Sequence, residues 1–182
     1  MRHVRRGGVY FRVCDPSWSD PSDTSYSRRF GGRWNPPDRD GRPGFGALYL
    51  NRTIAVARAN AQRHIRAQFG DVASIYDLLP ERLPDLQCYE VDETDVLDAV
   101  TPPGIAALGL APSYPTGIPH SPCQGIAEAA YEAGDAGIAA LSAVAPAEEE
   151  LVVFDRAVPE LAHATRREPF DAWYPASAKP GR

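Results

Sequence analysis

Arginine is the residue type whose placement in this sequence points most directly to chemistry. Residues 28–50, RRFGGRWNPPDRDGRPGFGALYL, hold five arginines, five glycines and one tryptophan. Glycine lets a ligand approach the backbone closely, and guanidinium offers a planar fork that matches phosphate and carboxylate oxygens. Arg33 follows Gly32 in this stretch, and a second arginine, Arg12, lies inside the apolar run 9–13, where an unpaired charge is costly. Together they predict a site for a phosphate or carboxylate ligand.

Two aromatic residues near these arginines are candidates for contact with a ring of such a ligand. Trp34 directly follows Arg33, and its indole either stacks on a base or anchors the loop in the core. Tyr49 lies in the apolar run 47–50 and supplies both a ring and a hydroxyl group. We expect Tyr49 and Trp34 to pack against a ring of the ligand while the arginines hold its charged part.

The charge of the chain is divided unevenly along its length. Residues 1–66 carry 13 arginines and five aspartates, a net charge of +8, whereas residues 67–182 carry six basic and 19 acidic residues, a net of −13, and the two sum to the −5 of the whole chain. Because the whole chain is acidic, a local pocket for a small anion is favoured over a broad nucleic-acid surface. An RNA-binding function of the Arg/Gly loop is an alternative, against which the acidic remainder of the chain speaks.

Other kinds of site have little support in the sequence. The P-loop, GxGxxG, HExxH and GxSxG signatures are absent. His120 and Cys123 are three residues apart, but two residues in a Pro-rich loop do not make a metal site, so we expect no metal. We interpret His64 as a helix-surface or partly buried histidine rather than as a catalyst.

The cysteine and hydropathy patterns indicate the cellular compartment in which the protein is expected. Cys14, Cys88 and Cys123 are far apart and odd in number, which favours unpaired thiols in a reducing compartment. No apolar run approaches the roughly 18 residues of a membrane span, and the basic N-terminus lacks the apolar core of a secretory signal. We therefore expect a cytoplasmic protein without membrane association.

Short apolar runs and separated helical stripes predict an α+β domain. The strongest helix signal begins after Thr53, a fitting N-cap, and runs to about residue 69, with Asn60 on a line beside the apolar stripe. The other expected elements are strands at 9–13, 47–50, 86–91, 136–141 and 150–155 and helices at 102–110 and 124–133. We expect residues 1–175 to form one domain and residues 176–182 to form a flexible tail.

The order of these motifs resembles a known family. The chain contains Tyr-Phe-Arg-Val (10–13), Gly-Gly-Arg-Trp-Asn (31–35), Ala-Leu-Tyr-Leu (47–50), an alanine-rich helix, Gly-Ile-Ala-Ala-Leu-Ser (137–142) and Glu-Leu-Val-Val-Phe (150–154). This order is similar to that of the RES domain family over roughly residues 9–156. The resemblance implies a core like that of ADP-ribosyltransferase toxins, in which helices flank mixed β-sheets.

The resemblance also implies an activity. RES proteins are typically toxins paired with Xre-type antitoxins, and characterised members consume NAD by phosphorolysis or hydrolysis, or ADP-ribosylate a protein. NAD would then be a substrate rather than a cofactor, with inorganic phosphate as one candidate acceptor. Carried over residue by residue, Arg12 and Arg33 match the arginines that hold the NAD phosphates in the family. Tyr49 matches the tyrosine of the LY strand, and Ser142 matches the family serine.

One position departs from the family pattern. The family glutamate is expected eleven residues after that tyrosine, where this chain has Asn60. Cleavage of the nicotinamide–ribose bond passes through an oxocarbenium-like cation, and losing a carboxylate that stabilises it costs on the order of 100- to 1000-fold in rate. Glu128 and Glu132 are candidate substitutes for that carboxylate.

Two hypotheses therefore stay open. The first is an NAD phosphorylase, NAD glycohydrolase or ADP-ribosyltransferase with Asn60, Ser142 and Tyr49 as its catalytic residues. Asn60 would hold the nicotinamide ribose, Ser142 would orient a ribose or phosphate oxygen, and Tyr49 would pack against a ring. The second is a nucleotide-binding module that kept the arginine pocket and lost catalysis, for which Asn60 is the motive.

Overall fold

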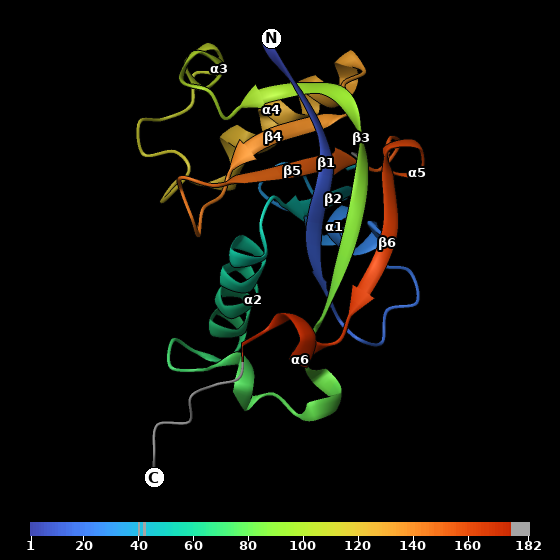
Figure 1. Ribbon diagram of the computed structural model, residues 1–182. Helices are drawn as coiled ribbons and strands as arrows, with labels where there is room; N and C mark the ends of the chain where they lie inside the picture. Colours follow the sequence, from blue (N-terminus) through green and yellow to red (C-terminus); the bar gives the residue numbers. More distant parts are fainter. Residues whose placement is uncertain (40, 42, 176–182) are drawn as a thin grey trace.

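Six strands form one mixed sheet in the computed structural model, which describes residues 1–39, 41 and 43–175. The strands are β1 (His3–Cys14), β2 (Ala47–Asn51), β3 (Asp85–Ala99), β4 (Gly137–Leu141), β5 (Glu149–Phe154) and β6 (Ala162–Glu168). Their order is β1-β2-β5-β4-β3-β6, and β1 pairs in addition with β3. The pairings therefore close into a circuit of five strands, with β6 added along β3 (Figure 1).

Helices cover the sheet and its lower end. They are α1 (Ser25–Phe30), α2 (Ile54–Phe69), α3 (Pro102–Ala107), α4 (His120–Ala133), α5 (Val158–Leu161) and α6 (Phe170–Trp173), together with the 3₁₀ turns η1 (Ile75–Asp77) and η2 (Pro80–Arg82). In Figure 1, α4 lies behind β4 and β5, whereas α2 and α6 lie at the end of the molecule away from the N-terminus.

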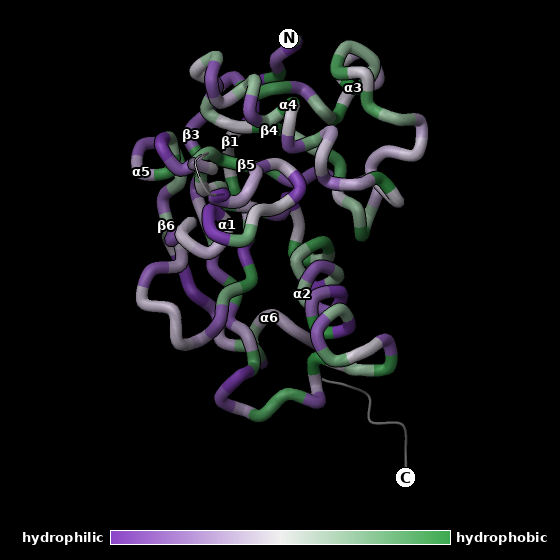
Figure 2. Tube along the Cα trace, turned by 180° about the vertical axis from the view of Figure 1, so that it is seen from behind, coloured by the Kyte–Doolittle hydropathy of each residue, from purple (hydrophilic) through white to green (hydrophobic). Residues whose placement is uncertain are grey.

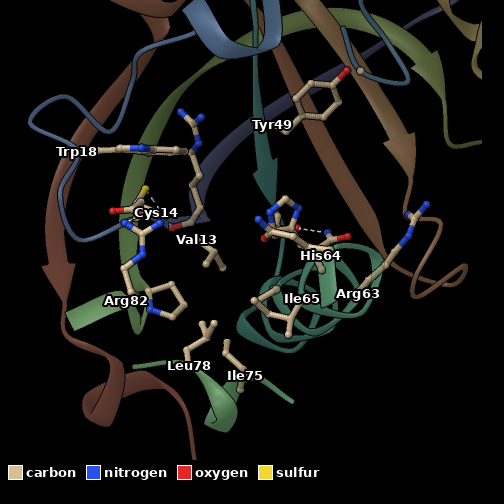
Figure 3. Close-up of a pocket in the computed structure, with 18 of the residues that line it drawn as sticks. Val13, Cys14, Trp18, Tyr49, Arg63, His64, Ile65, Ile75, Leu78 and Arg82 are labelled. Atoms are coloured by element: carbon tan, nitrogen blue, oxygen red, sulfur yellow. Dashed lines mark hydrogen bonds and ion pairs between the residues drawn. The ribbon is translucent and has the colours of Figure 1, made fainter. Parts of the chain in front are cut away.

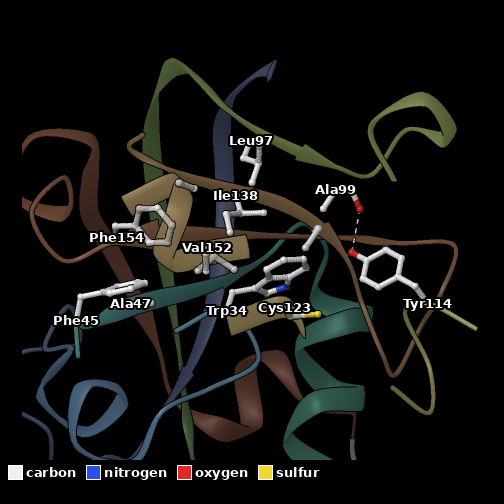
Figure 4. Close-up of a cluster of buried hydrophobic side chains, with 13 residues drawn as sticks. Trp34, Phe45, Ala47, Leu97, Ala99, Tyr114, Cys123, Ile138, Val152 and Phe154 are labelled. Atoms are coloured by element: carbon white, nitrogen blue, oxygen red, sulfur yellow. Dashed lines mark hydrogen bonds between the residues drawn. The ribbon is translucent and has the colours of Figure 1, made fainter. Parts of the chain in front are cut away.

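The two-residue period of the strands sorts their side chains into two cores. On β2, Leu48 and Leu50 enter the cluster enclosed by the strand circuit, whereas Ala47 and Tyr49 face the cluster beneath α4. On β5, Val152 belongs to the α4 side. Figure 4 shows this second cluster. The side chains of β2 and β5 that face α4 matter for function. The same row continues into polar residues where these strands end.

The helix α2 follows the prediction made from its stripe and cap. The Oγ1 atom of Thr53 accepts a hydrogen bond from the backbone N–H of Val56 at 3.3 Å, and the helix ends before Gly70. Its buried face consists of Val56, Ala57, Ala61 and Ile65. The tube in Figure 2 accordingly alternates between hydrophobic and hydrophilic colours around α2. Asn60 lies one turn after Val56, beside this buried face.

Several elements differ from the sequence-based expectations. The strand expected at 9–13 extends from His3 to Cys14, and the one expected at 86–91 extends to Ala99. The two pair along most of their length, and Arg5 Nε contacts Glu93 Oε2 at 3.1 Å in the part where both strands are charged. That part shows no apolar alternation in the sequence because its side chains are largely exposed.

Three helices and one strand were not predicted, namely α1, α5, α6 and β6. The strand β6 is polar and exposed over most of its length, so it carries no period-two pattern. The fold-class prediction of an α+β domain with a mixed sheet is confirmed. None of the helices in the described part of the chain is long and apolar enough to span a membrane. The predicted tail, residues 176–182, lies outside the described residues.

Candidate active site

A cavity of about 800 Å³ opens between the strand ends and α2 (Figure 3). Residues of β1, β2, α2 and β5 line it, together with the 3₁₀ turns, the loop after β1 and the first residue of α4. This volume lies within the range of about 300–1,000 Å³ that is usual for small-molecule sites.

Polar residues gather where the α4 side of the sheet ends. Asn51 follows Tyr49 on the same side of β2, and Glu150 precedes Val152 on the same side of β5. Asn51 and Glu150 are direct partners in the antiparallel register of the two strands. Ser142 comes directly after β4 and two residues after the buried Ala140, so it lies on the same side of the sheet as Ala140.

A chain of hydrogen bonds joins these residues to α2. Asn60 Nδ2 donates to Asn51 Oδ1 at 2.7 Å and to Glu150 Oε1 at 2.8 Å. Ser142 Oγ donates to the same Glu150 oxygen at 2.6 Å, and Asn51 Nδ2 donates to the carbonyl of Phe11 at 3.0 Å. The carboxylate of Glu150 is therefore held from two sides, by an amide on the helix and by a hydroxyl on the neighbouring strand end.

Arg12 forms part of the cavity wall from β1. Its guanidinium donates to the carbonyl oxygens of Pro21 and Asp23, and it lies 5.2 Å from the centre of the Trp18 ring. These contacts tie the loop after β1 to the strand and place a cation and an exposed indole side by side. Figure 3 shows Trp18 on the opposite side of the cavity from Arg63.

Arg33 reaches the same cavity from the glycine loop. Its Nη1 donates to the carbonyl of Leu141 at 3.4 Å. A tight turn presents the side chain, because the N–H of Gly32 donates to the carbonyl of Asn35 at 2.9 Å. The Tyr49 hydroxyl fixes this turn, since it accepts from the Trp34 N–H at 2.9 Å and donates to Asn35 Oδ1 at 2.8 Å. The two guanidinium groups thus converge on one cavity.

The pKa of the Tyr49 hydroxyl depends on two charged groups of the site, Glu150 and Arg33. Burial raises the pKa of its hydroxyl far above the ordinary value, the negative charge of Glu150 raises it further, and the positive charge of Arg33 acts in the opposite direction. The hydroxyl therefore stays protonated and serves as a fixed donor to Asn35. Tyr49 positions the arginine loop, and its ring lines the cavity.

Trp34 does not contact the cavity, which corrects the expectation that it packs on a ligand ring. Its side chain is 1% exposed and belongs to the cluster beneath α4, where it meets Tyr114 edge-on at 6.2 Å between ring centroids (Figure 4). The loop-anchoring interpretation is the correct one. Within the turn, Arg33 lines the cavity whereas its neighbour Trp34 is buried in the core.

Comparison with known proteins identifies the family and the fold of this chain. The family model described as "RES domain" matches residues 9–175. The chain belongs to the RES domain family. The resemblance seen in the arginine, tyrosine and serine motifs is therefore confirmed, and it extends beyond residue 156 to include β6 and α6.

Relatives of this RES domain include the NAD(+) phosphorylase MbcT of Mycobacterium tuberculosis (strain H37Rv) and of Mycobacterium bovis. Each is 31% identical over 105 residues, which cover 58% of this chain and 52% of the relative. The match thus spans about half the length of these relatives. A crystal structure of the M. tuberculosis MbcT–MbcA toxin–antitoxin complex is similar in fold, with a TM-score of 0.74 and 25% identity, covering 91% of this chain and 85% of that one.

Several cavity residues of this RES domain were missed from the sequence. They are Trp18, Asn51, Arg63, Arg82 and Glu150. His64 is an exposed residue of α2, as expected, and it also lines the cavity. Glu128 and Glu132, which were considered as replacements for the family glutamate, are not among the described residues that line the cavity. The signal that identifies Glu150 is the strand register that places it opposite Asn51.

The first residue of α4 adds a titratable group to the wall of the cavity. Partial burial lowers the pKa of His120 below its usual value, and the positive charges of Arg33 and Arg63 lower it further. Cys123, three residues further along α4, is on the buried face of that helix, and burial raises the pKa of its thiol to about 11. No cluster of three or more metal-ligating side chains occurs among residues 1–39, 41 and 43–175.

Proposed function

We propose that this RES domain binds NAD in the cavity and cleaves the bond between nicotinamide and ribose. The observation that carries the proposal is the convergence of Arg12 and Arg33 on one cavity that also holds the Asn60–Glu150 cluster. An anion-binding region and a carboxylate then face the same ligand, as a dinucleotide with a positively charged leaving group requires.

The arginines are suited to a diphosphate. The hydrogen bonds that they make end on backbone carbonyl oxygens. None of the ion pairs between described residues includes either of them. A guanidinium that forms no ion pair is ready to bind phosphate oxygens through charge-assisted hydrogen bonds. We assign Arg12 and Arg33 to the two phosphates of NAD.

The Asn60–Glu150 cluster is suited to the ribose next to nicotinamide; Asn60, Glu150 and Tyr49 line the cavity, whereas Ser142 is buried behind Glu150. Asn60 and Ser142 meet at the Glu150 carboxylate, and Tyr49 lies on the neighbouring strand. When the bond to nicotinamide breaks, its electron pair leaves with the nicotinamide nitrogen, and positive charge develops on the ribose ring. Negative charge and oriented dipoles near that ring stabilise the transition state more than the ground state.

We assign inorganic phosphate as the preferred acceptor. The relatives with a printed activity are NAD(+) phosphorylases. Phosphate is already an anion at neutral pH, so its attack on the ribose carbon requires little help from a general base. The products are then nicotinamide and ADP-ribose phosphorylated at the anomeric carbon. Water or a protein side chain as the acceptor would make the protein a glycohydrolase or an ADP-ribosyltransferase instead.

The same comparison supports a toxin that is held inactive by a partner protein. The similar structure is that of a toxin in complex with its antitoxin. We propose that this chain acts in the cytoplasm, where NAD is abundant, and that a small Xre-type antitoxin keeps it from consuming that pool. Co-expression with the product of an adjacent gene, followed by co-purification, tests this partner.

Measurement of nicotinamide release tests the activity. The purified protein is incubated with NAD, with and without inorganic phosphate, and nicotinamide and the ribose product are quantified by chromatography. We expect release that phosphate accelerates, and we expect Arg33→Ala to weaken NAD binding by about 10- to 100-fold because one or two charge-assisted hydrogen bonds are lost. Arg63→Ala is the matched control, since Arg63 lines the cavity from α2 without belonging to the glycine loop.

The binding-module hypothesis predicts a different result. Asn60 is the observation that favours it, because the family glutamate is absent from that position. A module of this kind binds NAD with an affinity that depends on Arg33 and yields no nicotinamide with any acceptor. Equal binding by wild type and Arg33→Ala contradicts both functions.

A further inference from the structure

The geometry points to Glu150 as the catalytic carboxylate of this protein, supplied from β5 to the position that Asn60 leaves uncharged on α2. The inference rests on the proposed NAD-cleaving function. It also removes the motive for regarding the chain as a binding module. The cluster holds one carboxylate, which comes from β5 and not from the helix α2.

The placement of Glu150 follows from the register of the sheet. Its partners across the sheet are Asn51 on β2 and Ala140 on β4, so it lies centrally in the row of residues that ends the α4 side. Its carboxylate contacts Asn60 Nδ2 at 2.8 Å. A carboxylate on the helix at position 60 would occupy the other end of this same contact. A carboxylate at either position, 60 or 150, would therefore lie at the same place in the cavity.

The hydrogen bonds around Glu150 leave one oxygen for a substrate. Asn60 and Ser142 both donate to Oε1, and among the described residues no donor reaches Oε2. Ser142 is fully buried, and Asn60 is held in turn by Asn51, so the carboxylate is fixed in orientation before a ligand arrives. We assign Oε2 to the ribose that loses nicotinamide, where it faces the positive charge developing on the ring.

The other acidic side chains of the cavity are committed elsewhere. Asp15 Oδ1 accepts from the backbone N–H and the hydroxyl of Ser17, at 2.9 and 2.6 Å. Asp77 Oδ2 accepts from the N–H of Ser74 at 2.8 Å and completes the capping box of η1. Both stabilise turns at their own position. Of the described acidic residues that line the cavity, Glu150 alone contacts Asn60 and Ser142.

The pairing also explains why position 60 carries an amide. Two carboxylates at a contact of 2.8 Å repel each other unless they share a proton, and a shared proton removes half of the negative charge. Asparagine donates to the carboxylate and leaves its full charge in place. Asn60 is accordingly a positioning residue, and Glu150 is the group that contacts the substrate.

Substitution of Glu150 by glutamine tests the assignment. Glu150→Gln keeps the acceptor oxygen for Asn60 and Ser142 while removing the charge. We expect kcat for nicotinamide release to fall by about 100- to 1000-fold, with the Kd for ADP-ribose unchanged because the arginines are intact. Glu148→Gln removes the same charge two residues away, outside the cavity lining, and is expected to retain wild-type kcat.

A charge-swapped pair keeps the test decisive if the single variant does not fold. Asn60→Glu combined with Glu150→Gln restores one carboxylate and one amide at the same contact, in exchanged positions. We expect its kcat to exceed that of Asn60→Gln with Glu150→Gln, which holds two amides, by about tenfold or more. Binding of ADP-ribose and the thermal midpoint establish that each variant is folded.

The outcomes separate this inference from the function on which it rests. If wild type releases nicotinamide and Glu150→Gln does so equally fast, the assignment of Glu150 is wrong and the proposed function stands. Equal activity of the charge-swapped and two-amide variants has the same meaning. If wild type binds NAD and releases no nicotinamide with any acceptor, both the function and the role of Glu150 are wrong.

Discussion

At the scale of single residues, charged groups of the cavity change the pKa of their neighbours. His120 is such a neighbour, and it titrates near physiological pH. Burial and the charges of Arg33 and Arg63 hold its pKa below the usual value, so the imidazole is mainly neutral at pH 7 in the free protein. A bound diphosphate offsets the charge of Arg33 and restores part of the lost pKa. Binding of the ligand is therefore linked to uptake of a proton at His120.

The sign of this linkage gives a prediction. The protonated protein binds a diphosphate more tightly, so the affinity for ADP-ribose should rise as pH falls from about 7.5 to about 5.5, by up to about tenfold for each pKa unit restored. Below the pKa of the free protein the affinity should level off. Isothermal titration calorimetry at several pH values measures the effect, and ADP-ribose avoids turnover.

A matched histidine variant decides whether His120 is responsible. His120→Gln should bind ADP-ribose with an affinity that is nearly independent of pH over this range. His64→Gln should keep the wild-type dependence, although His64 also lines the cavity. A pH dependence that disappears in His64→Gln and persists in His120→Gln would show that the linkage lies on α2 instead of α4.

At the scale of elements, the glycine loop before β2 depends on how closely it packs. A Cβ atom at Gly32 would lie 2.4 Å from the Tyr49 hydroxyl oxygen and 2.8 Å from Asn35 Oδ1. Both atoms are already fixed by hydrogen bonds within the turn, so neither can move away cheaply. The glycine is thus required by the buried tyrosine of the next strand.

Gly32→Ala should therefore damage both stability and binding. We expect the free energy of unfolding to fall by about 1–3 kcal/mol, as is typical when a packed region is overfilled. The affinity for ADP-ribose should fall as well, because the displaced turn carries Arg33. Urea denaturation and calorimetry measure the two effects.

A second glycine provides the control for this substitution. A Cβ at Gly125, inside α4, meets no atom within 4 Å. Gly125→Ala should increase stability by about 0.5–1 kcal/mol, since alanine favours the helix, and should leave the affinity unchanged. If Gly32→Ala behaves like Gly125→Ala, the packing of the turn against Tyr49 does not determine the shape of the site.

Local signals made some elements predictable and left others hidden. The helix α2 could be predicted because its cap and its stripe are both encoded within residues 53–69. The strand β2 could be predicted because four adjacent apolar residues enter two cores. The strand β6 could not, because its exposed residues satisfy only backbone pairing with β3.

The candidate site shows the same limit. Arg12 and Arg33 could be singled out because a charge in an apolar run and a charge between glycines are local anomalies. Glu150 could not, since a glutamate at a strand end is ordinary and its contact with Asn60 spans 90 residues. Only the strand order, which places β5 beside β2, brings the carboxylate to the helix that follows β2.

At the scale of the whole molecule, the three cysteine thiols lie in separate parts of the packed interior. Cys14 and Cys88 lie on the long strands β1 and β3, and Cys123 lies on the buried face of α4. All three are free and buried. Burial raises the pKa of Cys14 and of Cys123 to about 11, which is about two units above the ordinary value. At neutral to mildly alkaline pH, the reactive thiolate is therefore about 100-fold rarer than in an unfolded chain.

Alkylation of these thiols should consequently report unfolding of the entire domain. Cys14 lines the cavity and its backbone pairs with Asp85 of β3, so we expect this part of the cavity wall to open only when β1 leaves the sheet. We expect iodoacetamide at pH 8 to label all three thiols slowly and at equal rates, and we expect ADP-ribose at 100 times its Kd to slow every one by about 100-fold, because it stabilises only the folded state. Mass spectrometry assigns the labels. Fast labelling of Cys14 alone, or protection of Cys14 alone, would instead mean that the cavity opens locally while the rest of the sheet stays folded.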